Sequence, residues 1–462
     1  RVEGLDGRSE AVRLAGRALL PGMVNAPAPA FQRVRRGRTE FRGRGASDSF
    51  WTWREMMYAA AGRLTPEDVY DASRLAFMEM ALAGVTSVGE FHYLHRAPDG
   101  REYEDPNLLA REVVRAARDA GPRVALLRVA YERAGHLKGP DPRQRRFVEP
   151  EPETFMRNAD ALARELGGDA AREGGGAAAG APPRAWLGVA PHSVRAVTAG
   201  YLREVAAFAR ERVLPLHMHV AEQPAEVEAC LAETGRTPVA LLADEGVLAP
   251  NFTAVHAVHV TAGEAARMSA AGACVCACPT TERNLGDGVV PADLFFGEGV
   301  PVALGTDSHA QIDLLEDARE LEYHLRLNTL RRNVLAPAVE AADGGRAGGS
   351  PESGPPPAGG MSALAARLFE CATLAGARSI GAPVSTFEPG EAADFFTVDL
   401  DDPSIAGASA QDLLPAVVFS LTRAAVRETA VGGRLVVEGG RHPAQDEIVS
   451  RFKSLQRRLW GG

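Results

Sequence analysis

The sequence lacks several features that would assign a protein class at once. It has no run of about 18 apolar residues and no secretory signal pattern, so a soluble cytoplasmic protein is the expectation. It has no excess of positive charge, because 51 Lys and Arg residues face 60 Asp and Glu residues, for a formal net charge of -9. This balance argues against nucleic acid and anionic membranes as the main partners. The first residue is Arg1 rather than Met, so we expect a missing or processed N-terminus.

Cysteine is scarce, and its five residues fit a reducing compartment. Three of them, Cys274, Cys276 and Cys278, alternate in the stretch ACVCACP, a pattern that invites a metal-site interpretation. Residues two apart on a strand share one face at a spacing of about 7 Å, which suits packing better than chelation. Because free cysteine is commonly buried, we favour core packing for all three.

The chain does have length and an ordinary globular composition. Its 462 residues, 45% hydrophobic and 24% charged, leave room for one large barrel or two domains. Short apolar stretches alternate with amphipathic helical stretches such as 65–84, 106–121 and 198–212. Eight strands are predicted in this way, over 18–26, 86–91, 124–131, 185–192, 214–222, 253–260, 273–279 and 300–307. Strands that alternate with helices predict an α/β fold of the (β/α)8 TIM-barrel type.

Changes in composition predict how the chain is divided. The barrel is expected over 18–383, and a small β domain over 1–17 together with 384–440, where the pattern changes to short β segments. Residues 441–462 are expected to form a C-terminal helical tail. Two stretches rich in Gly, Ala and Pro, 167–183 and 343–360, lack apolar periodicity and are expected to be flexible inserted loops.

Polar residues gather at the ends of the predicted strands, at Glu90, His92, Tyr131, His192, His219, Glu222, His256 and Asp307. Barrel enzymes keep their chemistry at the C-terminal face of the barrel, where these ends meet. A histidine from the fifth strand, one from the sixth and an aspartate after the eighth form the ligand pattern of metal-dependent hydrolases. Such sites bind a divalent ion and lower the pKa of its water to about 7. The pattern therefore indicates an enzyme pocket.

Short motifs along nearly the whole chain carry a family resemblance. They are AFQR (30–33), SFWTWREMMY (49–58), GVTSVGEFHYLH (84–95), APHSVRAV (190–197), HMHVAEQ (217–223), CPTTERNLGDG (278–288), GTDSH (305–309) and RRNVLA (331–336). With them the chain resembles the amidohydrolase superfamily and, within it, the formimidoylglutamate deiminases. The resemblance implies an amidohydrolase-type barrel and a hydrolase of a carbon–nitrogen bond in a linear amidine. Its reaction would convert N-formimidoyl-L-glutamate to N-formyl-L-glutamate and ammonia in histidine degradation.

The resemblance also implies roles for single residues. His219 and Asp307 would be ligands of one divalent metal, with zinc as the expected ion. Glu222 would relay a proton to the substrate nitrogen, His256 would polarise the tetrahedral intermediate, and Asp307 would take a proton from the attacking water. Substrate-binding roles fall on Gln32, Arg54, Tyr93, His192 and Arg195. The two arginines suit a dicarboxylate because a guanidinium forms a bidentate pair with a carboxylate.

The sequence departs from the family pattern after the first predicted strand. The family places His-x-His directly before AFQR, where this chain has Pro27 and Pro29. Proline has neither an imidazole nor a backbone N–H, so its side chain cannot replace a metal ligand. His219 and Asp307 remain, with His256 as a possible third ligand, whereas catalytic zinc sites normally use three protein ligands. We therefore expect the metal to be held weakly or not at all, and turnover to be poor.

Two functions of different classes stay open. The first is a metal-dependent deiminase, which the whole-chain resemblance favours. The second is a catalytically inactive protein of the same fold that binds a glutamate-like ligand, which the two prolines favour; altered chemistry on a similar ligand is a further explanation of them. The expected partner is a small dicarboxylate amidine, with no nucleic acid or membrane, and a homodimer is open. The basic run over 33–45 is interpreted as a solvated loop, with attraction of a dianionic substrate as the minor alternative.

Overall fold

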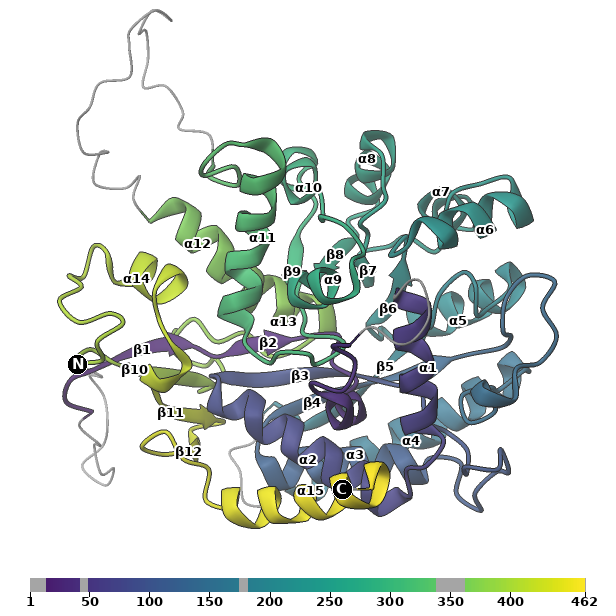
Figure 1. The fold of residues 1–462 in the computed structure, drawn as a ribbon, viewed down its shortest axis with the longest axis horizontal. Helices are drawn as coiled ribbons and strands as arrows, with labels where there is room; N and C mark the ends of the chain where they lie inside the picture. Colours follow the sequence, from purple (N-terminus) through teal and green to yellow (C-terminus); the bar gives the residue numbers. More distant parts are fainter. Residues whose placement is uncertain (1–13, 42–48, 174–181, 338–361, 462) are drawn as a thin grey trace, which may run out of the picture.

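The computed structural model describes residues 14–41, 49–173, 182–337 and 362–461 (Figure 1). Eight of the described strands form one parallel sheet in sequential order: β2 Met23–Asn25, β3 Val85–His92, β4 Arg123–Ala130, β5 Ala185–Pro191, β6 Leu216–Val220, β7 Phe252–His256, β8 Cys274–Ala277 and β9 Val302–Leu304. Where the sheet curls round, the backbone N–H of Ala26 donates to Leu304 O at 3.4 Å, so the barrel is nearly closed. The predicted (β/α)8 barrel is confirmed.

Helices surround the barrel and join its strands (Figure 1). They are α2 Pro66–Leu82, α3 Leu108–Ala120, α4 Pro152–Glu173, α5 Ala199–Glu211, α6 Pro224–Thr234, α7 Pro238–Asp244, α8 Ala262–Ala270, α9 Pro279–Leu285, α10 Ala292–Glu298, α11 Leu314–Thr329, α12 Ala363–Glu370 and α13 Gly376–Ile380. Local sequence explains where they start. The side chain of Thr65 accepts from the N–H of Asp68, the Asp68 carboxylate accepts from the N–H of Thr65, and Pro66 opens α2.

A second, antiparallel sheet of four strands is built from both ends of the chain. Its order is β1 Arg17–Pro21, β10 Phe395–Asp399, β11 Val426–Val431 and β12 Arg434–Val437. The predicted small β domain is thus present, but its boundary is corrected, because residues 17–21 pair with β10 and the barrel begins at Met23 rather than at residue 18. Gly22 separates the two strands. A Cβ there would lie 2.1 Å from Thr86 Oγ1, so only glycine lets the chain pass between the sheets.

The predicted inserted loops and the predicted C-terminal helical tail have different outcomes in the structure. The first part of 167–183 continues helix α4 to Glu173 and is not a loop, whereas 174–181 lies outside the described residues. The predicted loop over 343–360 and residues 1–13 of the predicted β domain also lie outside them. Helix α15, Gln445–Trp460, occupies most of 441–462 and packs along α2 (Figure 1). The helix α14, Leu413–Phe419, packs on α12.

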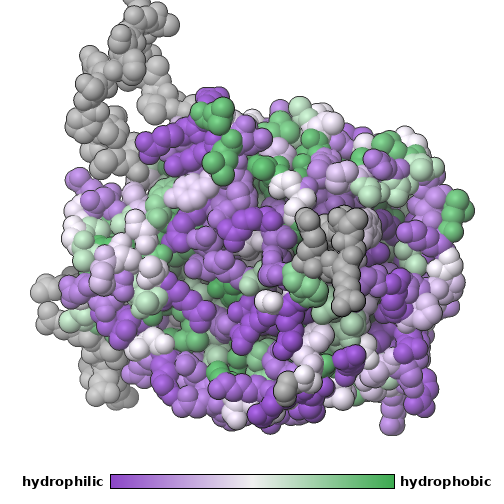
Figure 2. All heavy atoms as spheres, in the orientation of Figure 1, coloured by the Kyte–Doolittle hydropathy of each residue, from purple (hydrophilic) through white to green (hydrophobic). Residues whose placement is uncertain are grey.

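The visible face of the molecule is polar (Figure 2), and the alternating cysteines lie in the core. The face in Figure 2 is mostly hydrophilic, with apolar side chains scattered over it. No described helix combines the length and apolar character that crossing a bilayer requires. Cys274, Cys276 and Cys278 are free and buried, and they pack with Val255 and Ala303, in agreement with the packing role predicted for them.

Candidate active site

A pocket opens at the C-terminal ends of the barrel strands, with helix α1, Phe50–Ala61, forming one wall. Most of the residues with predicted site roles line it, namely Gln32, Arg54, Tyr93, His192, Arg195, His219, Glu222 and Asp307. The remaining one, His256, is fully buried beside Glu222 and Asp307. The rest of the wall is mainly aromatic and apolar: Pro29, Phe50, Trp53, Met57, Tyr58, Tyr131 and Phe147. The structure therefore brings the predicted residues together in one place.

Three possible metal ligands converge at the inner end of the pocket. His219 Nε2 lies 3.7 Å from Asp307 Oδ1, and His256 Nε2 lies 3.8 Å from Asp307 Oδ2. The ligand atoms of the three residues all lie within 4.8 Å of one another, and the buried Nε2 of His256 has no hydrogen-bond partner. Ligands of a tetrahedral zinc ion lie about 3.3–3.7 Å apart, and catalytic zinc commonly has three protein ligands. The donor set fits one divalent ion and includes His256, which the sequence offered only as a possible ligand.

Backbone contacts aim these side chains. His219 sits near the end of β6, and its Nδ1 lies 3.2 Å from His192 O, so its Nε2 faces the pocket. Asp307 follows β9, and its backbone N–H donates to Pro27 O at 3.1 Å. His256 and Asp307 have positive φ values of 67° and 30°. Such backbone conformations are costly outside glycine and are found most often at functional sites.

The site shifts the pKa values of two carboxyl groups, Glu222 and Asp307, in opposite directions. Burial raises the pKa of Glu222 above its usual value, although His256 and His219 oppose the rise. Burial alone would also raise the pKa of Asp307, but His219 and His256 outweigh it and lower that pKa. For His219, Asp307 and Glu222 outweigh the effect of burial and raise the pKa. The arrangement thus places a carboxyl group that retains its proton more readily beside one that stays ionised, as proton transfer in hydrolysis requires.

Two guanidinium groups occupy the outer end of the pocket. Arg54 lies over the rings of Trp51 and Tyr58, at 4.5 and 5.5 Å from their centroids. Its buried Nε has no hydrogen-bond partner, and within the described chain no carboxylate pairs with Arg54. Arg195 has Glu226 3.9 Å from its Nε; burial lowers the pKa of Arg195, but Glu226 and Tyr131 outweigh it and raise that pKa. This end can therefore bind an anion.

The proline segment between β2 and η1, Ala30–Arg35, closes one side of the pocket. Pro29 lines the pocket together with His219 and Asp307, so an apolar ring forms part of the wall. The Ala26–Pro27 peptide bond is cis. The neighbouring Ala28 donates its N–H to Gly89 O at 2.9 Å. Neither proline side chain offers a donor atom to a metal.

Glu282 is a site residue that sequence reasoning missed. It lies in the first turn of α9, is 1% exposed, and its Oε1 lies 3.1 Å from His256 Nδ1 and accepts the Cys278 N–H at 2.8 Å. Burial raises the pKa of Glu282 to about 8. In its ionised form this carboxylate keeps a proton on Nδ1 and leaves the Nε2 lone pair for the pocket. Its only signal in the sequence was its place in CPTTERNLGDG.

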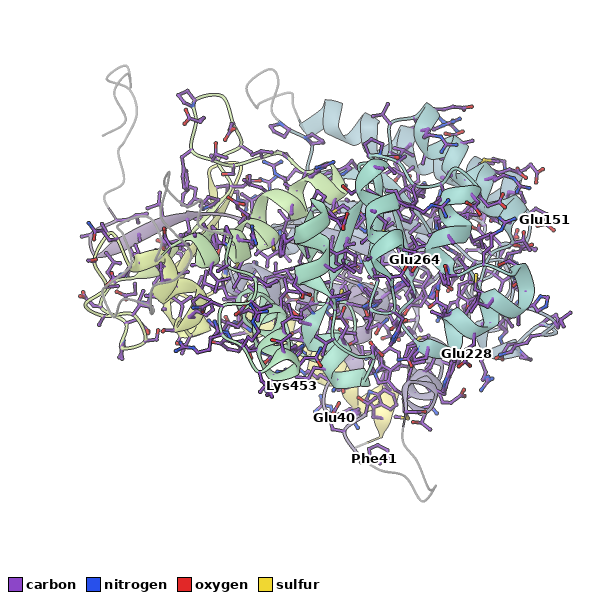
Figure 3. All side chains as sticks on the ribbon, turned by 90° about the horizontal axis from the view of Figure 1, so that it is seen from above. Glu40, Phe41, Glu151, Glu228, Glu264 and Lys453 are labelled. Atoms are coloured by element: carbon purple, nitrogen blue, oxygen red, sulfur yellow. The ribbon has the colours of Figure 1, made fainter. Side chains whose placement is uncertain are left out.

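Replacing Glu282 by Gln is expected to lower zinc affinity about 10- to 100-fold, because the partner of a metal-binding histidine tunes that ligand. Calorimetric zinc titration measures the change. Glu264→Gln is the matched control, since Glu264 is a buried carboxylate on the outer helix α8 that bonds to Thr261 and Thr237 (Figure 3). Unchanged zinc affinity in a folded E282Q protein would show that Glu282 has no part in holding His256.

Comparisons with known proteins agree with this geometry. The model of the Amidohydrolase family matches residues 18–436. A formimidoylglutamate deiminase from Pseudomonas aeruginosa is 36% identical over 97% of this chain and 90% of its own. A 5-methylthioadenosine/S-adenosylhomocysteine deaminase from Halobacterium salinarum is 29% identical over 97% of this chain and 88% of its own. The crystal structure of an amidohydrolase from Brucella melitensis is 36% identical, covers 96% of this chain and 89% of its own, and has a TM-score of 0.81. The crystal structure of an adenosine deaminase from Xanthomonas campestris with bound zinc is 20% identical and covers 96% of this chain and 86% of its own. It shares the fold at a TM-score of 0.74. With a catalytic-type donor cluster at the C-terminal face of its barrel, the chain belongs to the amidohydrolase family.

Proposed function

We propose that this protein is a metal-dependent deiminase that hydrolyses N-formimidoyl-L-glutamate to N-formyl-L-glutamate and ammonia, as in histidine degradation. The 36% identity to a formimidoylglutamate deiminase over nearly the whole chain supports the substrate. The observation that carries the proposal is that the two ends of the pocket carry different chemical groups. Possible metal ligands lie at its inner end, and Arg54, a partly buried cation without a carboxylate partner in the described chain, lies at its outer end. An amidine with carboxylates on its far side matches both ends.

The chemistry follows from the residues at the inner end. His219, His256 and Asp307 would hold one divalent ion, zinc in the first instance, which supplies Lewis acidity and a water activated at neutral pH. Asp307 accepts a proton from the water as its oxygen attacks the amidine carbon. Glu222 carries a proton to the terminal nitrogen, because the carbon–nitrogen bond breaks readily only when ammonia is the leaving group. The two protons of the water, one passed through Asp307 and one through Glu222, end on the departing nitrogen. The products are therefore N-formyl-L-glutamate and ammonia, and atoms and charge balance.

The outer end would position the substrate. Arg54 and Arg195 would bind the carboxylates through charge-assisted hydrogen bonds. His192 is neutral, because burial lowers its pKa well below the usual value, so it can contribute a hydrogen bond without adding charge. Tyr93 and Gln32 lie on the same wall. Holding both carboxylates fixes the amidine carbon beside the inner cluster, which lowers the entropic part of the barrier.

A second candidate is a catalytically inactive protein that binds a glutamate-like ligand in the same pocket. The observation that favours it is Pro29, which lines the pocket at a position where the family resemblance implies a ligand histidine. Ammonia release from N-formimidoyl-L-glutamate, measured together with bound metal, separates the two functions. Turnover that is lost with a chelator and restored by zinc supports the deiminase. Tight binding of N-formyl-L-glutamate without turnover at any zinc concentration supports the binding protein.

Replacing Arg54 by Met is expected to weaken binding of N-formyl-L-glutamate about 10- to 100-fold, because a charge-assisted pair contributes about 1.5–3 kcal/mol. Calorimetry measures this in either functional class. The control is Arg101→Met, since the Arg101 side chain is 85% exposed and pairs with Asp99. If R54M bound N-formyl-L-glutamate as tightly as R101M, the assignment of the outer end to a carboxylate would be wrong.

A further inference from the structure

Arg35 is a buried cation that the proposed mechanism leaves unused. It ends helix η1, is 3% exposed, and its guanidinium lies 4.2 Å from the centroid of the Trp53 ring. No carboxylate pairs with it in the part of the chain that the structure describes, and its Nε has no hydrogen-bond partner. Its polar contact is Gln32 Oε1, to which Nη2 donates. A buried guanidinium without a carboxylate in direct contact is costly, so it calls for a functional explanation.

Its neighbours in the sequence show that the unpaired state is specific to Arg35. Arg33 forms an ion pair with Glu79 at 2.6 Å and donates to His309 O at 2.7 Å. Arg36 also lies 3.4 Å from Glu79. These two arginines hold η1 against α2 through ordinary ion pairs. Arg35 instead points toward the pocket wall, where it contacts Gln32 and Trp53, both of which line the pocket.

A chain of hydrogen bonds runs from Arg35 to the pocket. Gln32 Nε2 donates to the Tyr93 hydroxyl at 2.7 Å. A guanidinium has donors only, so Gln32 must turn its carbonyl oxygen to Arg35 and its amide nitrogen to Tyr93. The Tyr93 oxygen then accepts a hydrogen bond, and its own O–H is free to donate. Among the described residues none accepts from it, and Tyr93, which lines the pocket, is 4% exposed.

We propose that Arg35 is a positioning residue that makes this wall a hydrogen-bond donor and so selects a carboxylate over a carboxamide on the ligand. The inference rests on the proposed function, because it assumes that a carboxylate reaches this wall. A carboxylate accepts only, and its hydrogen bonds are about twice as strong as those of a neutral group. The unpaired charge of Arg35 adds a positive potential at the same place. Without Arg35 the Gln32 amide can turn over, and Tyr93 can then donate to Gln32 instead of to the ligand.

The experiment compares ligands that differ in one group. Binding of N-formyl-L-glutamate, N-formyl-L-glutamine and N-formyl-L-isoglutamine is measured by calorimetry on the whole protein. The wild type is expected to prefer the dicarboxylate over the carboxamide that meets Tyr93. The Arg35→Met protein should bind the dicarboxylate about 10-fold more weakly than the wild type. Its affinity for that carboxamide should fall about 2-fold or less. Arg35→Lys, which still donates to Gln32, should keep most of the preference. Arg36→Met is the control and should leave it unchanged.

Two further variants test the direction of the hydrogen bonds. Gln32→Glu gives a side chain that accepts from both Arg35 and Tyr93, so it should remove the preference while keeping the cation paired. In Tyr93→Phe the preference should be lost, and adding Arg35→Met should cost little more. An equal loss on all ligands in R35M, or an unchanged preference in Q32E, overturns the proposal and leaves the proposed function standing. A wild type that binds none of the three ligands overturns both.

Discussion

Restoring histidine at both positions 27 and 29 is expected to raise zinc affinity by about four orders of magnitude, and deiminase turnover with it. A structural zinc site with four ligands yields roughly 10–16 kcal/mol, or about 3 kcal/mol for each ligand, which is about 100-fold. His219, His256 and Asp307 already approach one another closely enough to share an ion. Pro29 lines the same pocket, so a histidine there would face them.

The measurement is zinc affinity by competition with a chelator, followed by ammonia release at saturating zinc. Pro27→His and Pro29→His alone should each raise zinc affinity only about 100-fold of the roughly 10,000-fold gain, because a further ligand position stays empty in either. Pro140→His, at an exposed position, is the control for adding a histidine. Should the unaltered protein be purified with one equivalent of tightly held metal and brisk deiminase activity, three ligands would suffice and the expectation would be wrong.

Removing one member of the buried pair Arg128 and Glu149 is expected to destabilise the protein by about 3–5 kcal/mol. Arg128 is fully buried on β4, and its Nη2 lies 2.9 Å from Glu149 Oε1. Asn158 donates to the same oxygen at 2.8 Å, and Asn107 accepts from Arg128 Nε at 3.2 Å. Either single change, Arg128→Met or Glu149→Leu, leaves a buried charge without its partner. The double change removes both charges and should recover much of the loss.

Urea-induced unfolding of the two single variants and the double variant measures this. Arg115→Met, which breaks the exposed pair with Glu67, is the control and should cost less than about 1 kcal/mol. Burial alone would raise the pKa of Glu149, but Arg128 outweighs it and lowers the pKa to about 2 from a usual 4.5. The pair's contribution is therefore complete above about pH 4.5 and is lost as the pH falls toward 2. Single variants as mild as R115M would contradict the prediction.

Periodicity predicted the barrel because strands and helices alternate with different repeats, and it predicted the meeting of His219, His256 and Asp307 because the C-terminal ends of parallel strands share one face. The break between β1 and β2 left no such trace. Both strands are apolar and extended, and what separates them is the approach of Thr86 to Gly22, sixty-four residues earlier in the chain. Steric contacts of this kind depend on packing and not on local propensity.

The positions of Glu282 and Arg35 could not be read from the sequence for a related reason. The basic run over 33–45 was interpreted as a solvated loop, which is correct for the exposed Arg36 and Arg38 and wrong for Arg35. Residues 42–48 of the run lie outside the described part of the chain. A run of like charges does not show which member a neighbouring tryptophan will cover. Likewise, Glu282 reaches His256 only because α9 packs at the end of β7.

The backbone around the two prolines has a consequence for substitutions at their positions. Ala26 and Ala28 donate their N–H groups to Leu304 O and Gly89 O, and Pro27 contributes its carbonyl oxygen to Asp307. The described hydrogen bonds of the segment therefore need no N–H at positions 27 and 29. A substitution at either position therefore removes none of these hydrogen bonds, so the change from proline to a metal-binding side chain is expected to leave the barrel intact. The N–H groups that shape this strand end thus belong to other residues than the two at which further metal ligands would stand.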